Sequence, residues 1–462
     1  MQIKFPLHQT FYCYPKKKLQ QILWYFALLK LNIMRNIFLF IFSCTITFNL
    51  SAQKTTAIKC GAVLDVRTGQ LNKNVTIVVK NNKIESISPA GAVAKIKADT
   101  IIDLSAYTIL PGLIDCHTHV LLQGDITSED YDVQLLKESI PYRTIRAVRS
   151  CSIALQNGFT TIRDLGTEGA GYADVDLKKA IKNGEMPGPR MFVSTLAINT
   201  TGHYPISETS YAWELTIPKG LKEITGADEA RRVVRDQIAH GADWIKIYAD
   251  RSYSKLPDGS YRSLPNFTTE EIMAVGDEVK RSNRKLAAHA ITRDGILAAI
   301  NAGALSIEHG FGMDDECIQT MVKKNVYWCP TIYVNDFVAE GRAKAGSPIN
   351  KYFSETEPAL FKKATAAGVK IAYGTDIGGY DWNVAQTKDF DFMVQYGYTP
   401  LQAIQTATIN GSDLLGQPLL GELKAGNYAD IIAVTADPTQ NIQVLQHVKW
   451  VMKDGTIYKT IK

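Results

Sequence analysis

Eight strand-like segments alternate with stretches of helical periodicity between residues 109 and 414. The strand-like segments read LIDCHTHV, FTTIRD, RMFVSTL, DWIKIYAD, KLAAHA, LSIEHG, VYWCPTI and VKIAYGTD. Two of the helical stretches, ADEARRVVRDQIAHG and DGILAAINAG, end in glycine, which is a common stop signal for a helix. Alternating strands and helices predict a parallel sheet, and eight such units predict an α/β fold, the (β/α)8 or TIM barrel.

The two flanks of this region follow a different pattern. Residues 53–108 and 415–462 contain short segments of alternating polar and apolar residues, separated by turn signals such as Asn81-Asn82 and Asp454-Gly455. Neither flank is long enough to enclose a hydrophobic core by itself. We therefore expect both flanks to combine into one small β-sandwich domain beside the barrel domain of residues 109–414.

Residues 1–52 form a leader with six basic side chains and no acidic one. Within it, MRNIFLFIFSCTITFNLSAQ has a basic start, an apolar centre and small residues at its end, which is the pattern of a secretory signal peptide. We expect cleavage after Ala52 and export of the mature protein to the periplasm or the medium. Residues 1–33 are either an upstream extension, with translation starting at Met34, or a longer amino-terminal region of the signal peptide. A lipid anchor at Cys44 is an alternative to cleavage after Ala52. The apolar centre is too short to predict a stable membrane span.

The rest of the chain is electrically balanced, with 45 basic and 46 acidic side chains. This balance gives the mature protein no electrostatic reason to bind nucleic acid or an anionic membrane. We expect a small-molecule substrate as its partner, and a homo-oligomer is left open. The five cysteines after the leader are scattered and form no CxxC pair, which argues against a disulfide framework.

Polar side chains cluster at the carboxyl ends of the strand-like segments. His117 and His119 lie two residues apart, so a strand places both on one face. In a (β/α)8 barrel the carboxyl ends of all strands meet at one mouth. We expect six candidate ligands to converge there: His117, His119, Lys246, His289, His309 and Asp376. Imidazoles and carboxylates are typical ligands of zinc, so the sequence predicts a metal centre. The alternative for His117 and His119 is that they are ordinary polar residues on a half-exposed strand, without a role in metal binding.

Lys246 lies among apolar residues in DWIKIYA, which indicates that its side chain is buried. A lone ammonium group is strongly disfavoured in such surroundings. A salt bridge, for example to Asp376, is one explanation. The other is an uncharged amine that has reacted with carbon dioxide, because the resulting carbamate is an anionic ligand able to bridge two divalent cations. The carbamate, the carboxylate of Asp376 and a bridging hydroxide would nearly balance the charge of two zinc ions.

Further residues are candidates for the reaction itself. Asp376 lies beside glycines in YGTDIGG, and we expect its carboxylate to accept a proton from metal-bound water. His203 follows the third strand, and Tyr248 shares a strand face with the candidate lysine, so both are candidates for contact with the substrate. An exposed loop position for His203 and core packing for Tyr248 are the alternatives. Arg163 and Asp164 end the second strand, and we expect them to pair with each other.

The ordered set of these motifs resembles the amidohydrolase superfamily. The resemblance rests on PGLIDCHTH, GFTTIRDLG, GADWIKIY, AAHA, SIEHG, YGTD, ATINGSDLLG and GELKAGNYADIIAV, and it extends over about residues 57–460. It implies a TIM barrel with a β-sandwich made from both flanks. The segments AHA and SIEHG look most like the imidazolonepropionase-related branch, which includes Xaa-Pro dipeptidases and carboxypeptidase-like enzymes acting on N-acyl amino acids.

The resemblance also implies a site with two divalent metal ions. His117, His119 and Asp376 would hold the more buried ion, and His289 and His309 would hold the more exposed one. Lys246, carboxylated by carbon dioxide, and a hydroxide would bridge them. Zinc is the expected metal, and manganese and cobalt also fit these ligands.

Two relatives within the superfamily are excluded by single positions. Mononuclear deaminases carry a glutamate three residues after the fifth-strand histidine, where this chain has Thr292. Imidazolonepropionase uses one metal ion and has no bridging lysine, so Lys246 argues against that activity.

We therefore interpret the chain as a binuclear metal-dependent amidohydrolase that cleaves a C–N amide bond by attack of a metal-bridging hydroxide. The expected substrate is a dipeptide, as in prolidases, or an N-acyl amino acid. A cyclic amidase or a lactonase would use the same metal centre and is an alternative. A catalytically inactive binding barrel is an alternative of another class, but it predicts missing ligands, and none is missing.

Overall fold

The structure is a computed structural model that describes residues 16–44, 54–89, 98–203 and 211–461. The chain divides into two units, Met1–Gln53 and Lys54–Lys462. In the first unit the structure describes helix α1 (Lys16–Cys44), and the predicted cleavage point after Ala52 lies outside the described residues. Among the residues that are described, no helix combines the length and the apolar character needed to cross a membrane.

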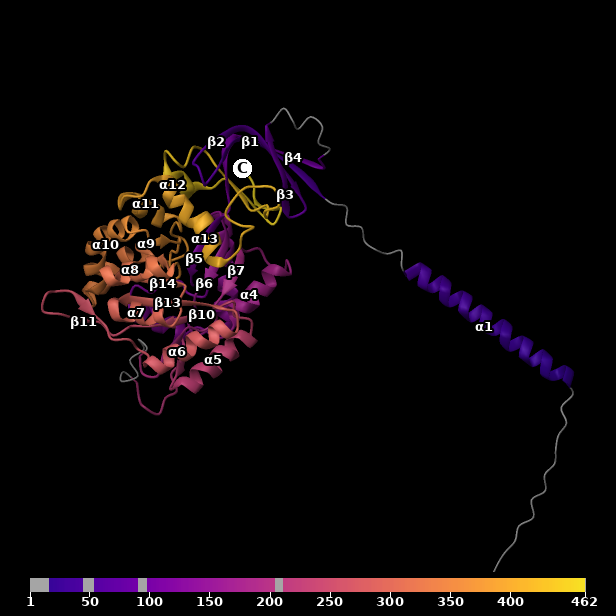
Figure 1. The fold of residues 1–462 in the computed structure, drawn as a ribbon, viewed down its shortest axis with the longest axis horizontal. Helices are drawn as coiled ribbons and strands as arrows, with labels where there is room; N and C mark the ends of the chain where they lie inside the picture. The colour runs from indigo at the N-terminus through magenta and orange to yellow at the C-terminus, as the bar shows by residue number, and fades with distance from the viewer. Residues whose placement is uncertain (1–15, 45–53, 90–97, 204–210, 462) are drawn as a thin grey trace, which may run out of the picture. The chain divides into compact units, whose positions relative to one another are not determined.

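One sheet of the second unit joins strands from both flanks of the chain (Figure 1). Its order is β19-β18-β17-β4-β1-β2-β3, where the strands are β1 (Thr55–Leu64), β2 (Leu71–Lys80), β3 (Lys83–Pro89), β4 (Thr100–Pro111), β17 (Ile431–Val434), β18 (Trp450–Lys453) and β19 (Thr456–Lys459). Strand β4 pairs with β1 on one side and with β17 on the other. The seven strands are therefore hydrogen-bonded into one sheet, where we expected the two sheets of a sandwich.

The turn predicted at Asp454-Gly455 connects β18 to β19. Its two residues have φ angles of 50° and 73°. A positive φ at both central residues is the signature of the tight hairpin turn that Asp-Gly favours.

All eight strands expected in the central region are present and run parallel to their neighbours. One sheet contains β5 (Leu113–Thr118), β6 (Phe159–Asp164) and β7 (Arg190–Val193). The other contains, in order, β16 (Lys370–Ile371), β15 (Tyr327–Cys329), β14 (Ser306–Gly312), β13 (Lys285–Thr292) and β10 (Trp244–Tyr248). Strand β8 (Ile198–Thr200) pairs with β10, and β9 (Lys222–Ile224) pairs with β8 at the edge of this sheet. A small hairpin, β11 (Ser254–Lys255) and β12 (Tyr261–Arg262), follows β10.

Backbone hydrogen bonds connect the two central sheets. The amide of Cys116 in β5 donates to the carbonyl of Tyr373, which follows β16, over 2.8 Å. The amide of Asp243, just before β10, donates to the carbonyl of Val193 in β7 over 2.9 Å. Strands β5, β6 and β10 are buried along their whole length, as expected for parallel strands covered on both faces.

Helices connect the strands and pack against them. They are α2 (Ser128–Leu136), α3 (Ile140–Gln156), α4 (Ala173–Lys182), α5 (Ala227–Ala239), α6 (Thr269–Arg281), α7 (Arg293–Asn301), α8 (Asp315–Lys324), α9 (Ile332–Lys344), α10 (Ile349–Ala366), α11 (Lys388–Gln395), α12 (Pro400–Gln405) and α13 (Gly411–Leu415), with a π-helical turn at Thr406–Asn410 and a 3-10 helix at Ile442–His447. Figure 1 shows α5 and α6 side by side below the strand β10.

Local sequence signals explain where several helices begin and end. The side chain of Thr268 accepts from the amide of Glu271 at the start of α6, and the Glu271 side chain bonds back to Thr268. The stops predicted for α5 and α7 lie at Gly241 and Gly303, whose φ angles of 110° and 96° favour glycine. The five cysteines described are buried and free, as predicted.

Candidate metal centre

The six candidate ligands lie at the carboxyl ends of five central strands. His117 is in β5 and His119 directly follows it, Lys246 is in β10, His289 is in β13 and His309 is in β14, while Asp376 follows β16. All of them are buried except Asp376, which is partly exposed. The polar side chains of these five strands therefore lie together at one cavity, as the strand pattern predicted.

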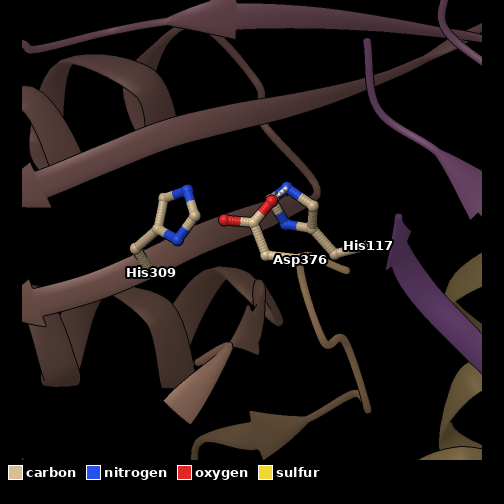
Figure 2. A group of neighbouring side chains, drawn as sticks. All are labelled: His117, His309 and Asp376. Atoms are coloured by element: carbon tan, nitrogen blue, oxygen red, sulfur yellow. Dashed lines mark ion pairs between the residues drawn. The ribbon is translucent and has the colours of Figure 1, made fainter. Parts of the chain in front are cut away.

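Asp376 lies at the centre of this group. Its Oδ1 atom is 3.4 Å from Nε2 of His117 and 3.2 Å from Nε2 of His119. Figure 2 shows the carboxylate between the rings of His117 and His309, and one ligand atom from each of these three residues fits within 4.8 Å of the others. His289 adjoins the group through His309, with ring centroids 4.6 Å apart.

Each of the four histidines has one ring nitrogen engaged by a partner away from Asp376. Nδ1 of His117 lies 2.9 Å from Oε2 of Glu308, and Nδ1 of His119 lies 2.9 Å from the carbonyl oxygen of Gly166. Both partners can only accept, so both histidines carry a proton on Nδ1. Nε2 of His117 is buried and has no hydrogen-bond partner among the described residues.

The other two histidines are held by hydroxyl groups. Nδ1 of His309 lies 2.8 Å from Oγ1 of Thr331, and Nε2 of His289 lies 2.9 Å from the hydroxyl of Tyr253. In His117, His119 and His309 the nitrogen left to bind a metal ion is therefore Nε2. In His289 it is Nδ1. A ring nitrogen oriented in this way, with its partner nitrogen bonded to protein, is the usual arrangement of a metal ligand. The donor set therefore fits divalent metal ions.

Lys246 is 1% exposed, and its Nζ atom lies 5.8 Å from the centroid of the Tyr248 ring. Burial lowers the pKa of its amine, against the opposing charges of Glu308 and Asp376. Within the described part of the chain, Lys246 forms no ion pair, so the salt bridge to Asp376 that we weighed is not formed. Carbon dioxide reacts with the uncharged form of an amine, and the lowered pKa of Lys246 favours that form.

The charges of this cluster keep Asp376 ionised. Burial raises the pKa of Asp376, but the charges of His117 and His119 lower it by more, to well below its usual range. Burial and the charge of Lys246 lower the pKa of His117 to about 4. Burial also lowers the pKa of His119, but the hydrogen bond and the charge of Asp376 raise it by more, to about 9.

A cavity of about 390 Å³ opens onto the cluster. All six candidate ligands line this cavity, and its wall also contains Tyr248, Glu168, Arg251 and Tyr253. The hydroxyl of Tyr248 lies 3.2 Å from Oε1 of Glu168, and the guanidinium of Arg251 lies 4.8 Å from the centre of the Tyr248 ring. Tyr248 is therefore both buried and part of the cavity wall.

His203 lies elsewhere in the described structure. Its side chain is exposed, its Nδ1 atom lies 3.1 Å from Oγ1 of Thr200, and it is not among the described residues that line the cavity. The residues that follow it, 204–210, lie outside the description. The structure thus brings Tyr248 to the candidate site and does not bring His203 there.

Arg163 does not pair with Asp164, contrary to the expectation from the sequence. Its guanidinium lies 2.9 Å from Oε1 of Glu308, and Asp164 instead accepts from the amide of Val120 over 2.8 Å. Successive residues of a strand point to opposite faces, which separates these two side chains.

Several residues of the site were not singled out from the sequence. They are Glu308 and Tyr253, which bond to the candidate ligands His117 and His289, and Glu168, which lies in the cavity wall with a φ of 48°. For Glu308 the motif SIEHG placed an acidic residue in a buried strand beside a candidate ligand, which is a usable signal.

Comparison with known proteins identifies similar sequences and structures. The model of the amidohydrolase family matches residues 108–462. Ochratoxinase of Aspergillus niger is 32% identical over 432 residues, which cover 88% of this chain and 87% of that protein. A crystal structure of a Xaa-Pro dipeptidase with methionine bound in its active site has a TM-score of 0.78 and is 32% identical, covering 88% of this chain and 100% of that one.

A more distant relative is the imidazolonepropionase of Flavobacterium johnsoniae. It is 22% identical over 388 residues, which cover 78% of this chain and 85% of that protein. Together with the solved structures, these relatives imply a TIM barrel with an additional domain, and the sheets described above are those of an α/β protein.

Proposed function

Because the chain belongs to the amidohydrolase family and is a hydrolase of C–N bonds, we propose that it cleaves the amide bond of a dipeptide or an N-acyl amino acid at a site with two divalent metal ions. The observation that carries this proposal is the arrangement of four imidazoles, each with one ring nitrogen bonded to protein. Nε2 of His117 and Nε2 of His119 lie within 3.4 Å of Asp376, and His289 adjoins the group through His309. Similarity to proteins named Xaa-Pro dipeptidase and ochratoxinase supports this substrate class.

The ligands divide into two groups by position. His117, His119 and Asp376 would hold one ion, since Asp376 lies within 3.4 Å of both histidines. His289 and His309 would hold the other, and their rings adjoin each other. The buried amine of Lys246, carboxylated by carbon dioxide, would bridge the two ions. Bound divalent ions polarise a carbonyl group and lower the pKa of water to about 7, and zinc is the metal we propose.

The side chains of the site then have distinct tasks in the hydrolysis. The amide and one water molecule are converted to a carboxylic acid and an amine. Asp376 accepts the proton of the attacking water at its carboxylate and delivers it to the leaving nitrogen. Tyr248 or His203 orients the substrate through its carbonyl oxygen, and the place of Tyr248 in the cavity wall favours Tyr248 for this task.

We also propose how the fold and the location of the protein serve this function. The hydrogen bonds from β5 to Tyr373 and from Asp243 to β7 support closure of the two central sheets into a (β/α)8 barrel, with strands of residues 53–108 and 415–462 forming the second domain. The pattern of residues 34–53 supports export with cleavage after Ala52, which would give the enzyme access to extracellular peptides.

A substrate panel tests the proposal. The mature protein, loaded with zinc in bicarbonate buffer, is assayed on dipeptides, N-acyl amino acids, cyclic amides and lactones, and kcat/KM is compared. We expect the linear amides to be hydrolysed fastest. Preference for cyclic amides or lactones would replace the proposed substrate class, and a metal-loaded protein that hydrolyses none of the four would support an inactive binding barrel instead.

A further inference from the structure

We propose that Glu308, fixed by Arg163, positions His117 for metal binding and thereby makes the ion at His117 the more tightly held of the two. This inference rests on the proposed function, because it concerns the order in which the two proposed ions bind. Glu308 is not among the described residues that line the cavity, so its role is that of a positioning residue.

The contact between His117 and Glu308 is completely buried. Their side chains are 1% and 0% exposed, and Nδ1 of His117 donates to Oε2 of Glu308 over 2.9 Å. A carboxylate that accepts from one nitrogen of an imidazole fixes the tautomer and the ring orientation, and it makes the other nitrogen a stronger donor to a metal ion. That other nitrogen, Nε2, is the one that lies beside Asp376.

Arg163 in turn fixes Glu308. Its guanidinium pairs with Oε1 of Glu308 over 2.9 Å and also donates to the carbonyl of Cys116 over 2.6 Å and to Oγ of Ser306 over 3.0 Å. The guanidinium also lies 4.4 Å from the Trp244 ring. One arginine thus ties Glu308 to β5, β10 and β14 and provides the positive charge that a buried carboxylate requires.

In the other three histidines, the protein-bonded ring nitrogen has no carboxylate at hydrogen-bonding distance among the described residues. The partners of His119, His309 and His289 are the carbonyl of Gly166 and the hydroxyls of Thr331 and Tyr253. The carboxylate of Glu168 lies 3.7 Å from Nδ1 of His119, beyond a hydrogen bond. The site is therefore asymmetric, with a charged partner behind His117 and neutral hydroxyls behind both histidines of the second ion.

Two substitutions test the affinities of the two proposed ions separately. Glu308→Gln keeps the shape of the side chain and removes its charge, whereas Thr331→Val keeps the shape and removes the hydroxyl behind His309. We expect two steps of zinc binding in competition with a chelator. Glu308→Gln should weaken the tighter step by about 10- to 100-fold and spare the weaker one, and Thr331→Val should do the reverse. The visible spectrum with one equivalent of cobalt should change in the first variant and not in the second.

A second variant protects the test against misfolding, because Glu308→Gln leaves a buried guanidinium without its partner. Arg163→Met combined with Glu308→Gln removes both charges, and its thermal unfolding reports whether it is folded. If a folded variant binds the first zinc ion within twofold of the wild-type affinity, or if both steps weaken equally, the role of Glu308 is refuted. If the wild-type protein hydrolyses no amide while Glu308→Gln still weakens only the tighter step, the proposed function is overturned and the role of Glu308 is supported.

Discussion

The hydroxyl of Tyr253 lies 2.9 Å from Nε2 of His289 and 3.1 Å from Oδ1 of Asp250. The carboxylate of Asp250 can only accept, so the tyrosine donates to it and accepts the proton of Nε2. Asp250 is fixed in its turn by the amides of Ile291 and Thr292, over 2.9 and 2.8 Å. This chain of hydrogen bonds sets the tautomer of His289 in which Nδ1 is available as a ligand.

Tyr253→Phe removes this hydroxyl and keeps the ring. We expect the ion proposed at His289 and His309 to bind about 10- to 100-fold more weakly, because His289 loses the partner that orients it. Zinc titration of the folded variant measures the effect. Tyr261→Phe is the control, since Tyr261 packs on Tyr352 outside the ligand group. Equal zinc affinity in the two variants would mean that the hydroxyl does not orient the ligand.

Lys246→Ala removes the proposed bridge between the metal ions. We expect turnover to be lost and the number of bound ions to fall below two, because each of the two proposed ions would lose the ligand that they share. Metal analysis of the purified protein and a hydrolysis assay check this result. Lys255→Ala, at an exposed lysine of β11, is the control and should behave as wild type. Retention of two ions and full activity by the Lys246 variant would refute the bridging role.

Asp376→Asn tests the proton transfer. The amide keeps the size of the side chain but cannot take up the proton of the attacking water, so we expect kcat to fall by about 10²- to 10⁴-fold. Asp381→Asn is a matched control in the same loop, where Oδ1 of Asp381 accepts from the amide of Asn383. Steady-state measurement of kcat for both variants checks this expectation. Loss of activity in both would point to disturbance of the loop.

The strand pattern of the sequence was sufficient to predict which side chains lie together around the cavity. Residues at the carboxyl ends of parallel strands share one edge, so His117, Lys246, His289 and His309 could be assigned to one site without knowledge of their contacts. This inference needs only the order and the ends of the strands, which long apolar segments define well.

Glu308 could not be placed by the same reasoning. In a regular strand Glu308 and His309 point to opposite faces, so a ligand at His309 would direct Glu308 away from the site. His309 has a φ of 71°, in the left-handed region, and this break in the alternation lets both side chains reach the interior. Such a conformation is enforced by surrounding packing, which the local sequence does not encode.

Contacts between side chains of distant strands could not be predicted from the sequence either. Arg163 and Asp164 are neighbours in the chain, so pairing between them was the simplest expectation. The pairing with Glu308 joins residues from β6 and β14 across the interior, and it depends on the relative positions of strands that only the folded structure provides.

The two candidates for orienting the substrate can be separated by mutation. Tyr248 lines the cavity, whereas His203 is exposed and lies next to residues outside the description. We expect Tyr248→Phe to lower kcat on the order of 10²-fold with little change in metal content, as for loss of one donor to a developing oxyanion. His203→Ala is assayed in parallel. A larger fall in kcat for His203→Ala would assign the task to the histidine.

Asp125 gives the cavity wall a pH-dependent stability. Burial raises the pKa of its carboxyl to about 7, although the charge of Arg342 opposes this rise. The carboxylates of Asp376 and Glu168 raise the pKa further, and Arg251 lowers it. An aspartate in the unfolded chain has a pKa of about 3.9, so the folded protein binds the proton more tightly than the unfolded chain. The resulting contribution to stability is fully present below about pH 4 and is lost as the pH rises through about 7.

Asp125→Asn removes this titration. Relative to the variant, the wild-type protein should therefore become progressively less stable between about pH 4 and pH 7, with a constant difference above that range. Thermal unfolding of both proteins at steps of pH measures the difference in Tm. Asp228→Asn, at an exposed position of α5, should show no such trend. A difference between wild type and Asp125→Asn that stays constant from pH 4 to pH 7 would show that Asp125 titrates alike in the folded and unfolded chain, and burial would then not control its proton.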